Sequence, residues 1–156
     1  IIQSGKGTSK SSGAVSISTS DGGTAGVSGN IGLTTGDTAN GNTGTIAFTS
    51  GKSTGGKGGS ITLSVGEGNT GIGGDFSVNA GNTIADSGTT GGKVLLQSGE
   101  SALTSSGEFT LSTPNAGLAG VSGNLGLTSG TSSVGNSGTI SLSTGKSTGG
   151  KVDGIN

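Results

Sequence analysis

The feature that most constrains this chain is a short run of alternating residues that recurs along its whole length. Each run places two apolar side chains two positions apart, with a small residue between them in every run but 93–98, as in AVSIST at 14–19 and TIAFTS at 45–50. A period of two is typical of a half-buried β-strand and not of a helix. The nine apolar pairs are Val15/Ile17, Ile31/Leu33, Ile46/Phe48, Ile61/Leu63, Phe76/Val78, Val94/Leu96, Phe109/Leu111, Leu125/Leu127 and Ile140/Leu142.

The runs keep a regular register. Successive pairs begin 15 to 18 residues apart, and a glycine lies two positions before each pair. We call these the border glycines: Gly13, Gly29, Gly44, Gly59, Gly74, Gly92, Gly107, Gly123 and Gly138. Glycine supplies 38 of the 156 residues, but it does not fall at every third position and Pro114 is the single proline, which excludes collagen. A flexible linker has no reason to keep such a register, so we expect a folded repeat.

A longer period lies above the short one. When the chain is shifted by 94 residues, 13–57 falls on 107–151 and 26 of these 45 positions are identical. Six short repeats make up one long repeat. The predicted organisation is a single continuous repeat array over 1–156, a window on a longer protein, with a long repeat at 13–106, a partial copy at 107–156 and part of a preceding copy at 1–12.

One short repeat is too small to fold alone. Its two apolar side chains contribute roughly 3–6 kcal/mol when buried, whereas ordering about fifteen backbone positions costs on the order of 15–30 kcal/mol. Stacked repeats overcome this deficit, because ladder hydrogen bonds and apolar columns form between neighbours. We therefore predict an all-β fold: a β-solenoid (parallel β-helix) of ~15-residue strand-turn repeats, with two or three strands per coil and a dry core between facing apolar ladders. The border glycines are expected to take positive φ at its corners. A long antiparallel meander is the rival, although its loops of about eight residues exceed those that hairpins favour.

The heptapeptide GKSTGGK, at 51–57 and again at 145–151, has the Gly-Lys-Ser of a phosphate-binding loop. That motif also needs a glycine five positions before its Gly-Lys pair. Ile46 and Ile140 occupy this position, and no helical pattern follows to supply a cradle of amide groups. We interpret the heptapeptide as a lysine-bearing corner.

Other chemistry is poorly represented. GIGGDFSV at 71–78 is similar to the calcium-binding nonapeptide repeat, but no acidic residue recurs nine positions from Asp75. The chain has no His and no Cys, so the usual catalytic bases, nucleophiles and zinc ligands are missing. We predict no catalytic residue, no cofactor-binding residue and no metal ligand, and that the protein is not an enzyme.

Charge and hydropathy limit the partners. The net charge is −1, the seven lysines are spread along the chain, and Phe is the only aromatic residue. These features argue against nucleic acid, and no run reaches the ~18 apolar residues of a membrane span. Lys52, Lys57, Lys146 and Lys151 recur through the long repeat, and we interpret them as keeping a fibre soluble and blunting lateral β-pairing.

The pattern GVSGNxGLTxG followed by GNxGTI and GKSTGGK resembles the long Gly/Ser/Thr-rich repeat arrays of secreted and cell-surface proteins in microalgae of the diatom lineage. It is more loosely similar to bacterial surface-fibre solenoids. The resemblance implies an extracellular or cell-surface location and a structural or adhesive role, and it implies no catalytic residue.

The expected function is that of a structural subunit of an extracellular fibre or surface filament, self-associating through stacked β coils. Its expected partners are copies of itself, joined head-to-tail or laterally, with extracellular matrix or surface glycans as further candidates. The alternative is an ice- or glycan-binding, adhesive solenoid that uses a flat face of outward Ser and Thr residues such as Thr110 and Ser112. A passive spacer is a third, weaker reading.

Overall fold

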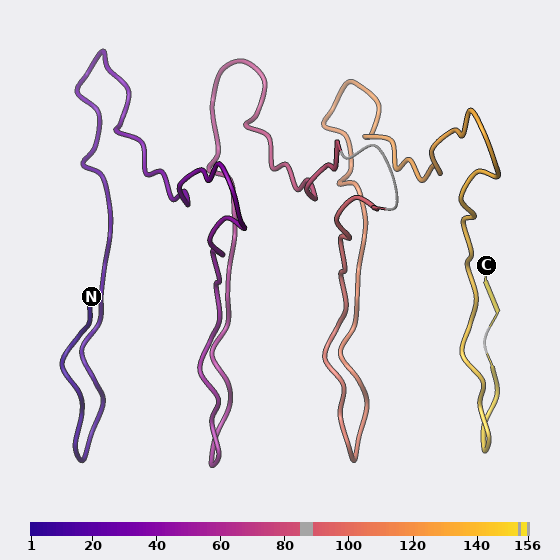
Figure 1. Ribbon diagram of the computed structural model, residues 1–156, viewed down its shortest axis with the longest axis horizontal. Coiled ribbons are helices and arrows are strands. Elements are labelled where there is room, and N and C mark those ends of the chain that lie inside the picture. Colours follow the sequence, from indigo (N-terminus) through magenta and orange to yellow (C-terminus); the bar gives the residue numbers. More distant parts are fainter. Residues whose placement is uncertain (85–88, 153, 156) are drawn as a thin grey trace. The chain divides into compact units, whose positions relative to one another are not determined.

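The computed structural model describes residues 1–84, 89–152 and 154–155, and it contains neither a helix nor a β-strand among them. The chain divides into two compact units, Ile1–Ser77 (unit 1) and Val78–Asn156 (unit 2). In each unit the chain alternates between straighter stretches and loops that reverse its direction (Figure 1). The predicted β-solenoid is therefore wrong, and so is the antiparallel meander, because the described residues form an irregular coil.

The missing sheet has a physical reason. Alternation decides which side chains share a face, but a sheet also needs the backbones of neighbouring strands to stay ~4.8 Å apart over the whole run. Here the backbone hydrogen bonds between separate stretches close loops instead. Gly13 N donates to Gly5 O at 3.3 Å, and Gly92 N donates to Gly81 O at 2.8 Å. These backbone hydrogen bonds join the two ends of a loop. The alternating runs of the described residues are not joined to one another by a ladder of such bonds.

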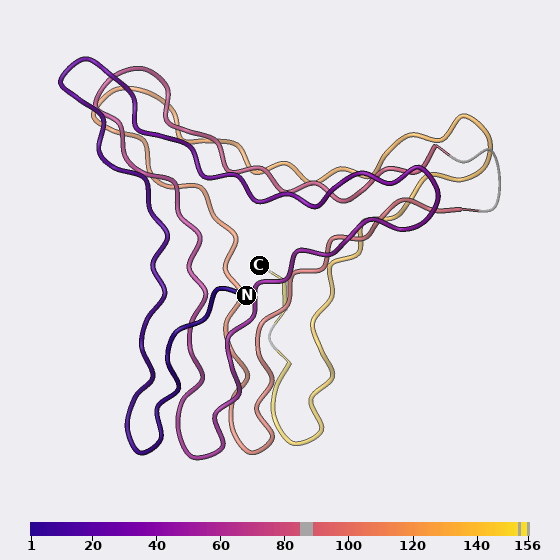
Figure 2. The same cartoon turned by 60° about the vertical axis from the view of Figure 1, so that its left-hand side comes forward.

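The nine alternating runs are nevertheless recognisable as structural elements, which we call segments. They are residues 14–19, 30–35, 45–50, 60–65, 75–80, 93–98, 108–113, 124–129 and 139–144, and none contains a bend. The described bends and turns all fall outside the segments, in the loops that precede, separate or follow them, at 8–10, 24–26, 39–41, 54–56, 69–72, 102–104, 118–120, 133–135 and 148–150. The first four of these stretches return 94 residues later, so the two copies of the long repeat bend at equivalent positions (Figure 2).

The border glycines lie at the necks of the loops, where the two flanking stretches of chain approach each other. A Cβ atom built on any of the nine would lie 2.9 to 3.7 Å from a side-chain atom of the last residue of the preceding segment, or of Ser4 for Gly13. Gly44 faces Thr35 Cγ2 at 3.2 Å, for example, and Gly74 faces Val65 Cγ1 at 2.9 Å. At Gly29, Gly44, Gly74 and Gly92 the added Cβ would be closer than an ordinary contact, so glycine leaves room for a close approach there, and at the other five border glycines it would make an ordinary contact.

Positive φ occurs elsewhere, and the prediction for the border glycines is wrong. The described glycines with positive φ are Gly41 (134°), Gly71 (76°), Gly120 (136°) and Gly135 (105°), and all four lie inside loops. Gly41 and Gly135 are equivalent positions of the long repeat. The loops turn at their tips through these glycines, and the necks need small residues but no left-handed backbone.

The surface area shows how little of the chain is covered. Its accessible surface is 15476 Å², whereas a folded chain of this mass exposes about 6,800 Å² and an extended one about 21,000 Å². No residue is buried in the described part of the chain. The dry core expected between apolar ladders is therefore not found within one chain.

Candidate functional site

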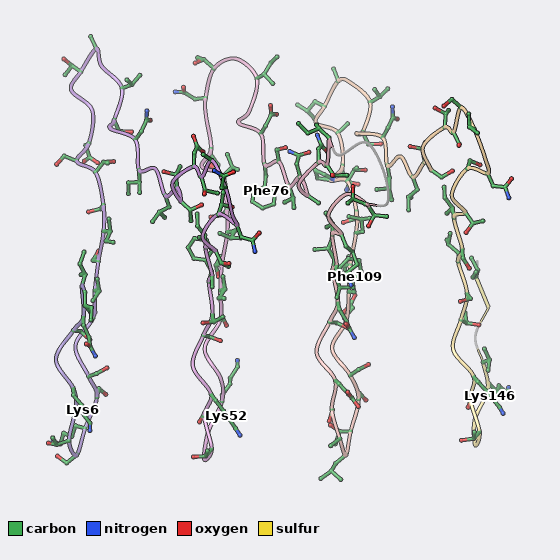
Figure 3. All side chains as sticks on the ribbon, viewed as in Figure 1. Lys6, Lys52, Phe76, Phe109 and Lys146 are labelled. Atoms are coloured by element: carbon green, nitrogen blue, oxygen red, sulfur yellow. The ribbon has the colours of Figure 1, made fainter. Side chains whose placement is uncertain are left out.

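The described residues form no pocket and bring together no group of three acidic, His or Cys residues that could hold a metal ion. They also include no helix that is long and apolar enough to cross a membrane. Asp75, which the sequence sets beside Phe76, stands at the start of a segment, and the Phe76 side chain next to it is exposed (Figure 3). The candidate functional features of the described residues are therefore loops and exposed surfaces.

The GKSTGGK loops bend at residues 54–56 and 148–150. In the second loop the amide N–H of Gly150 donates to Ser147 Oγ at 2.9 Å. In the first loop, Ser53 Oγ lies 3.4 Å from a Cβ built on Gly56. Ser147 Oγ lies at the same distance from a Cβ built on Gly150, so the two serines are placed alike. A phosphate-binding loop instead aims several amide groups at its ligand. The serine of this motif serves the local turn.

Threonine hydroxyls close two other loop necks in the same way. Thr19 Oγ1 donates to the carbonyl oxygen of Gly29 at 3.1 Å, and Thr113 Oγ1 donates to that of Gly123 at 3.0 Å. These two contacts are 94 residues apart, and so are the backbone hydrogen bonds from Gly13 to Gly5 and from Gly107 to Gly99. The two copies of the long repeat therefore share the hydrogen bonds that join the two ends of these loops.

The apolar pairs of the segments are the most regular surface feature. Their side chains are 46% to 71% exposed, although the sequence predicts that they are buried in a core. Phe76 and Phe109 are exposed like the rest of the set (Figure 3). Since every segment presents such a pair, each unit displays half-covered apolar side chains at regular intervals along its length.

A second set of apolar side chains lies in the loops and was not singled out from the sequence. It consists of Val27, Ile72, Ile84, Leu103, Leu118, Val121 and Val134, which are 93% to 111% exposed. Val27 and Val121 belong to the two copies of GVSGN, so the repeat itself contained a signal for this position. The lysine-bearing loops 5–13 and 51–59 contain no Val, Ile or Leu.

No family model, curated protein or solved structure matches this chain. The resemblance to microalgal surface arrays therefore stays a prediction.

Proposed function

We propose that the chain is a structural subunit of an extracellular fibre or surface filament, and that it associates with copies of itself. The observation that carries this proposal is the exposure of the apolar pairs in all nine segments. The chain covers only about a quarter of its extended-chain surface, against about 70% for an ordinary domain of this length. Such a chain needs a partner to cover its apolar side chains.

A second copy suits these side chains better than an unrelated protein. The pairs recur every 15 to 18 residues, and a partner that covers several of them at once needs the same spacing. Another copy has that spacing because its sequence is the same. Repeats that contact their neighbours through equivalent surfaces also extend without a natural stop, and such head-to-tail contacts produce filaments.

The association does not require the solenoid that the sequence suggests. Covering the apolar pairs removes hydrocarbon from water whatever the backbone geometry, at roughly 25 cal/mol for each Å² covered. No observation favours the ice- or glycan-binding alternative. That function needs a flat Ser/Thr face, and the described residues contain no sheet to present one.

Sedimentation velocity of the chain over a range of concentrations tests the proposal, with electron microscopy of the most concentrated samples. We expect the sedimentation coefficient to rise with concentration and thin unbranched filaments to be visible. A chain that stays monomeric and expanded at every concentration would contradict the proposal and would support a passive spacer instead.

The extracellular location rests on the resemblance alone. An antibody against the GKSTGGK loop tests it directly, because lysine-bearing loops are exposed. We expect the antibody to label intact cells of the source organism without permeabilisation. Labelling that appears only after permeabilisation would overturn the location.

A further inference from the structure

The charges of unit 1 are sorted between its loops. Its four lysines, Lys6, Lys10, Lys52 and Lys57, all lie in loops 5–13 and 51–59. Three of its four acidic residues, Asp21, Asp37 and Glu67, lie in the other three loops, 20–29, 36–44 and 66–74. The four positive and four negative side chains cancel, so the unit is neutral as a whole while its loops are not.

The sorting also has a direction within the unit. Loops 5–13 and 51–59 lie at the same end of unit 1, where Lys6 and Lys52 are labelled in Figure 3. Loops 20–29 and 66–74 lie toward another end, and the third acidic loop, 36–44, lies at neither of these ends (Figure 2). Neither lysine loop contains an acidic residue, and none of the three acidic loops contains a lysine. Unit 1 therefore has a basic end with four lysines and an acidic end with Asp21 and Glu67, and Asp37 lies outside both.

We infer that the basic loops of one copy dock against the acidic loops of a second copy, and that this contact sets the register of the association. The inference rests on the proposed function and names the polar part of its interface. Complementary charges select the partner and the register more than they add affinity. A neutral unit with two charged ends fits another copy of itself. An anionic polymer would be attracted to the basic end and repelled by the acidic one.

The interpretation of the lysines as a guard against lateral β-pairing loses its basis, because the described residues contain no strand edge to protect. Lys146 and Lys151 reproduce the lysine loop in unit 2. Loop 99–107 is different, because Glu100 and Thr104 stand at the positions equivalent to Lys6 and Lys10. We expect loop 99–107 to take no part in this docking.

Salt dependence of the unmodified chain is the first test. The Debye length falls from about 10 Å at 0.1 M salt to about 3 Å at 1 M, which screens contacts between exposed charges. We expect the association constant, measured by sedimentation velocity, to fall at least about tenfold over this range. Association that is unchanged or stronger at high salt would overturn the inference.

Charge reversal is the second test. One variant carries Lys→Glu at the four lysines of unit 1 and at Lys146 and Lys151, and a second carries Asp21→Lys, Asp37→Lys and Glu67→Lys. We expect each variant alone to associate more weakly than the parent chain. The two variants mixed together should recover association, because each then offers the end that the other lacks. A matched control with Lys→Arg at the same six lysines keeps the charge and should associate like the parent.

Three further outcomes would overturn the inference. In the first, the mixture of the two variants associates no better than either alone. In the second, the Lys→Glu variant associates normally but no longer binds dextran sulfate, which would assign the lysine loops to an anionic polymer. In the third, the parent chain does not associate at all, in which case the proposed function fails as well. In the first two outcomes the parent still associates, so the proposed function survives and the failures are distinguishable.

Discussion

The apolar side chains of the segments and those of the loops differ in how far they are covered. Segment pairs are 46% to 71% exposed, whereas apolar side chains in the loops are 93% to 111% exposed. The residue types are similar, so the difference reflects where each side chain lies in the chain. Segment pairs are partly covered apolar surfaces, whereas each loop presents an apolar side chain that is almost fully exposed.

The largest expected effect comes from removing one segment pair. Covering the exposed half of Ile46 and Phe48 contributes about 1.5–3 kcal/mol in total. The double change Ile46→Ser with Phe48→Ser should therefore weaken self-association about ten- to hundredfold, measured by sedimentation velocity. The matched loop change, Leu103→Ser with Val134→Ser, should weaken it by less than about twofold. Equal losses from the two double variants would remove the distinction between segments and loops.

A smaller effect is expected at the loop necks. A Cβ added by Gly44→Ala would lie 3.2 Å from Thr35 Cγ2, and the same change at Gly51 would meet no atom within 4 Å. Crowding of this kind costs about 1 kcal/mol, which is about a fivefold change in an equilibrium. Gly44→Ala should make loop 36–44 about fivefold easier to cleave in limited proteolysis. If Gly51→Ala has the same effect on its own loop, close approach does not explain the border glycines.

The smallest effect is expected from the threonine hydroxyls. Thr113→Val removes the hydrogen bond to Gly123 O while keeping the shape of the side chain. The site is exposed, so water replaces the lost partner and the cost is about 0.5 kcal/mol. Hydrogen exchange in loop 114–123 should be about twofold faster, and Thr19→Val should do the same for loop 20–29. Ser112→Ala is the control, and an equal change there would assign the effect to the segment.

The sequence predicts where the elements lie but not how they are arranged. Alternation and the border glycines marked where straight segments end, because side-chain size and turn chemistry act locally. The sheet could not be derived in this way, since pairing over 45–50 or 60–65 depends on how distant stretches are placed. The role of Gly44 was also misassigned, because a glycine that gives room and a glycine that gives positive φ look the same in a sequence.

The candidate surfaces were predictable only in part. The apolar pairs were found from their period, but their exposure depends on tertiary placement. The lysines are spread along the sequence, so they do not suggest a basic surface when read in order. Lys6 and Lys52 are brought to one end of unit 1 by the loops that carry them (Figure 3). Grouping charges by loop would have shown this sorting, and grouping them by position in the chain concealed it.

The central claim is that copies of the chain cover the apolar pairs, and the phenylalanines test it most directly. Phe48, Phe76 and Phe109 are the three phenylalanines of the chain, and each belongs to a segment pair. Fluorophenylalanine incorporated at these positions reports on segments alone, through the ¹⁹F shift between H₂O and D₂O. We predict three solvent-exposed signals in the dilute chain and three protected signals in the associated state. Phenylalanines that remain equally exposed to water in the assembled material would contradict the account.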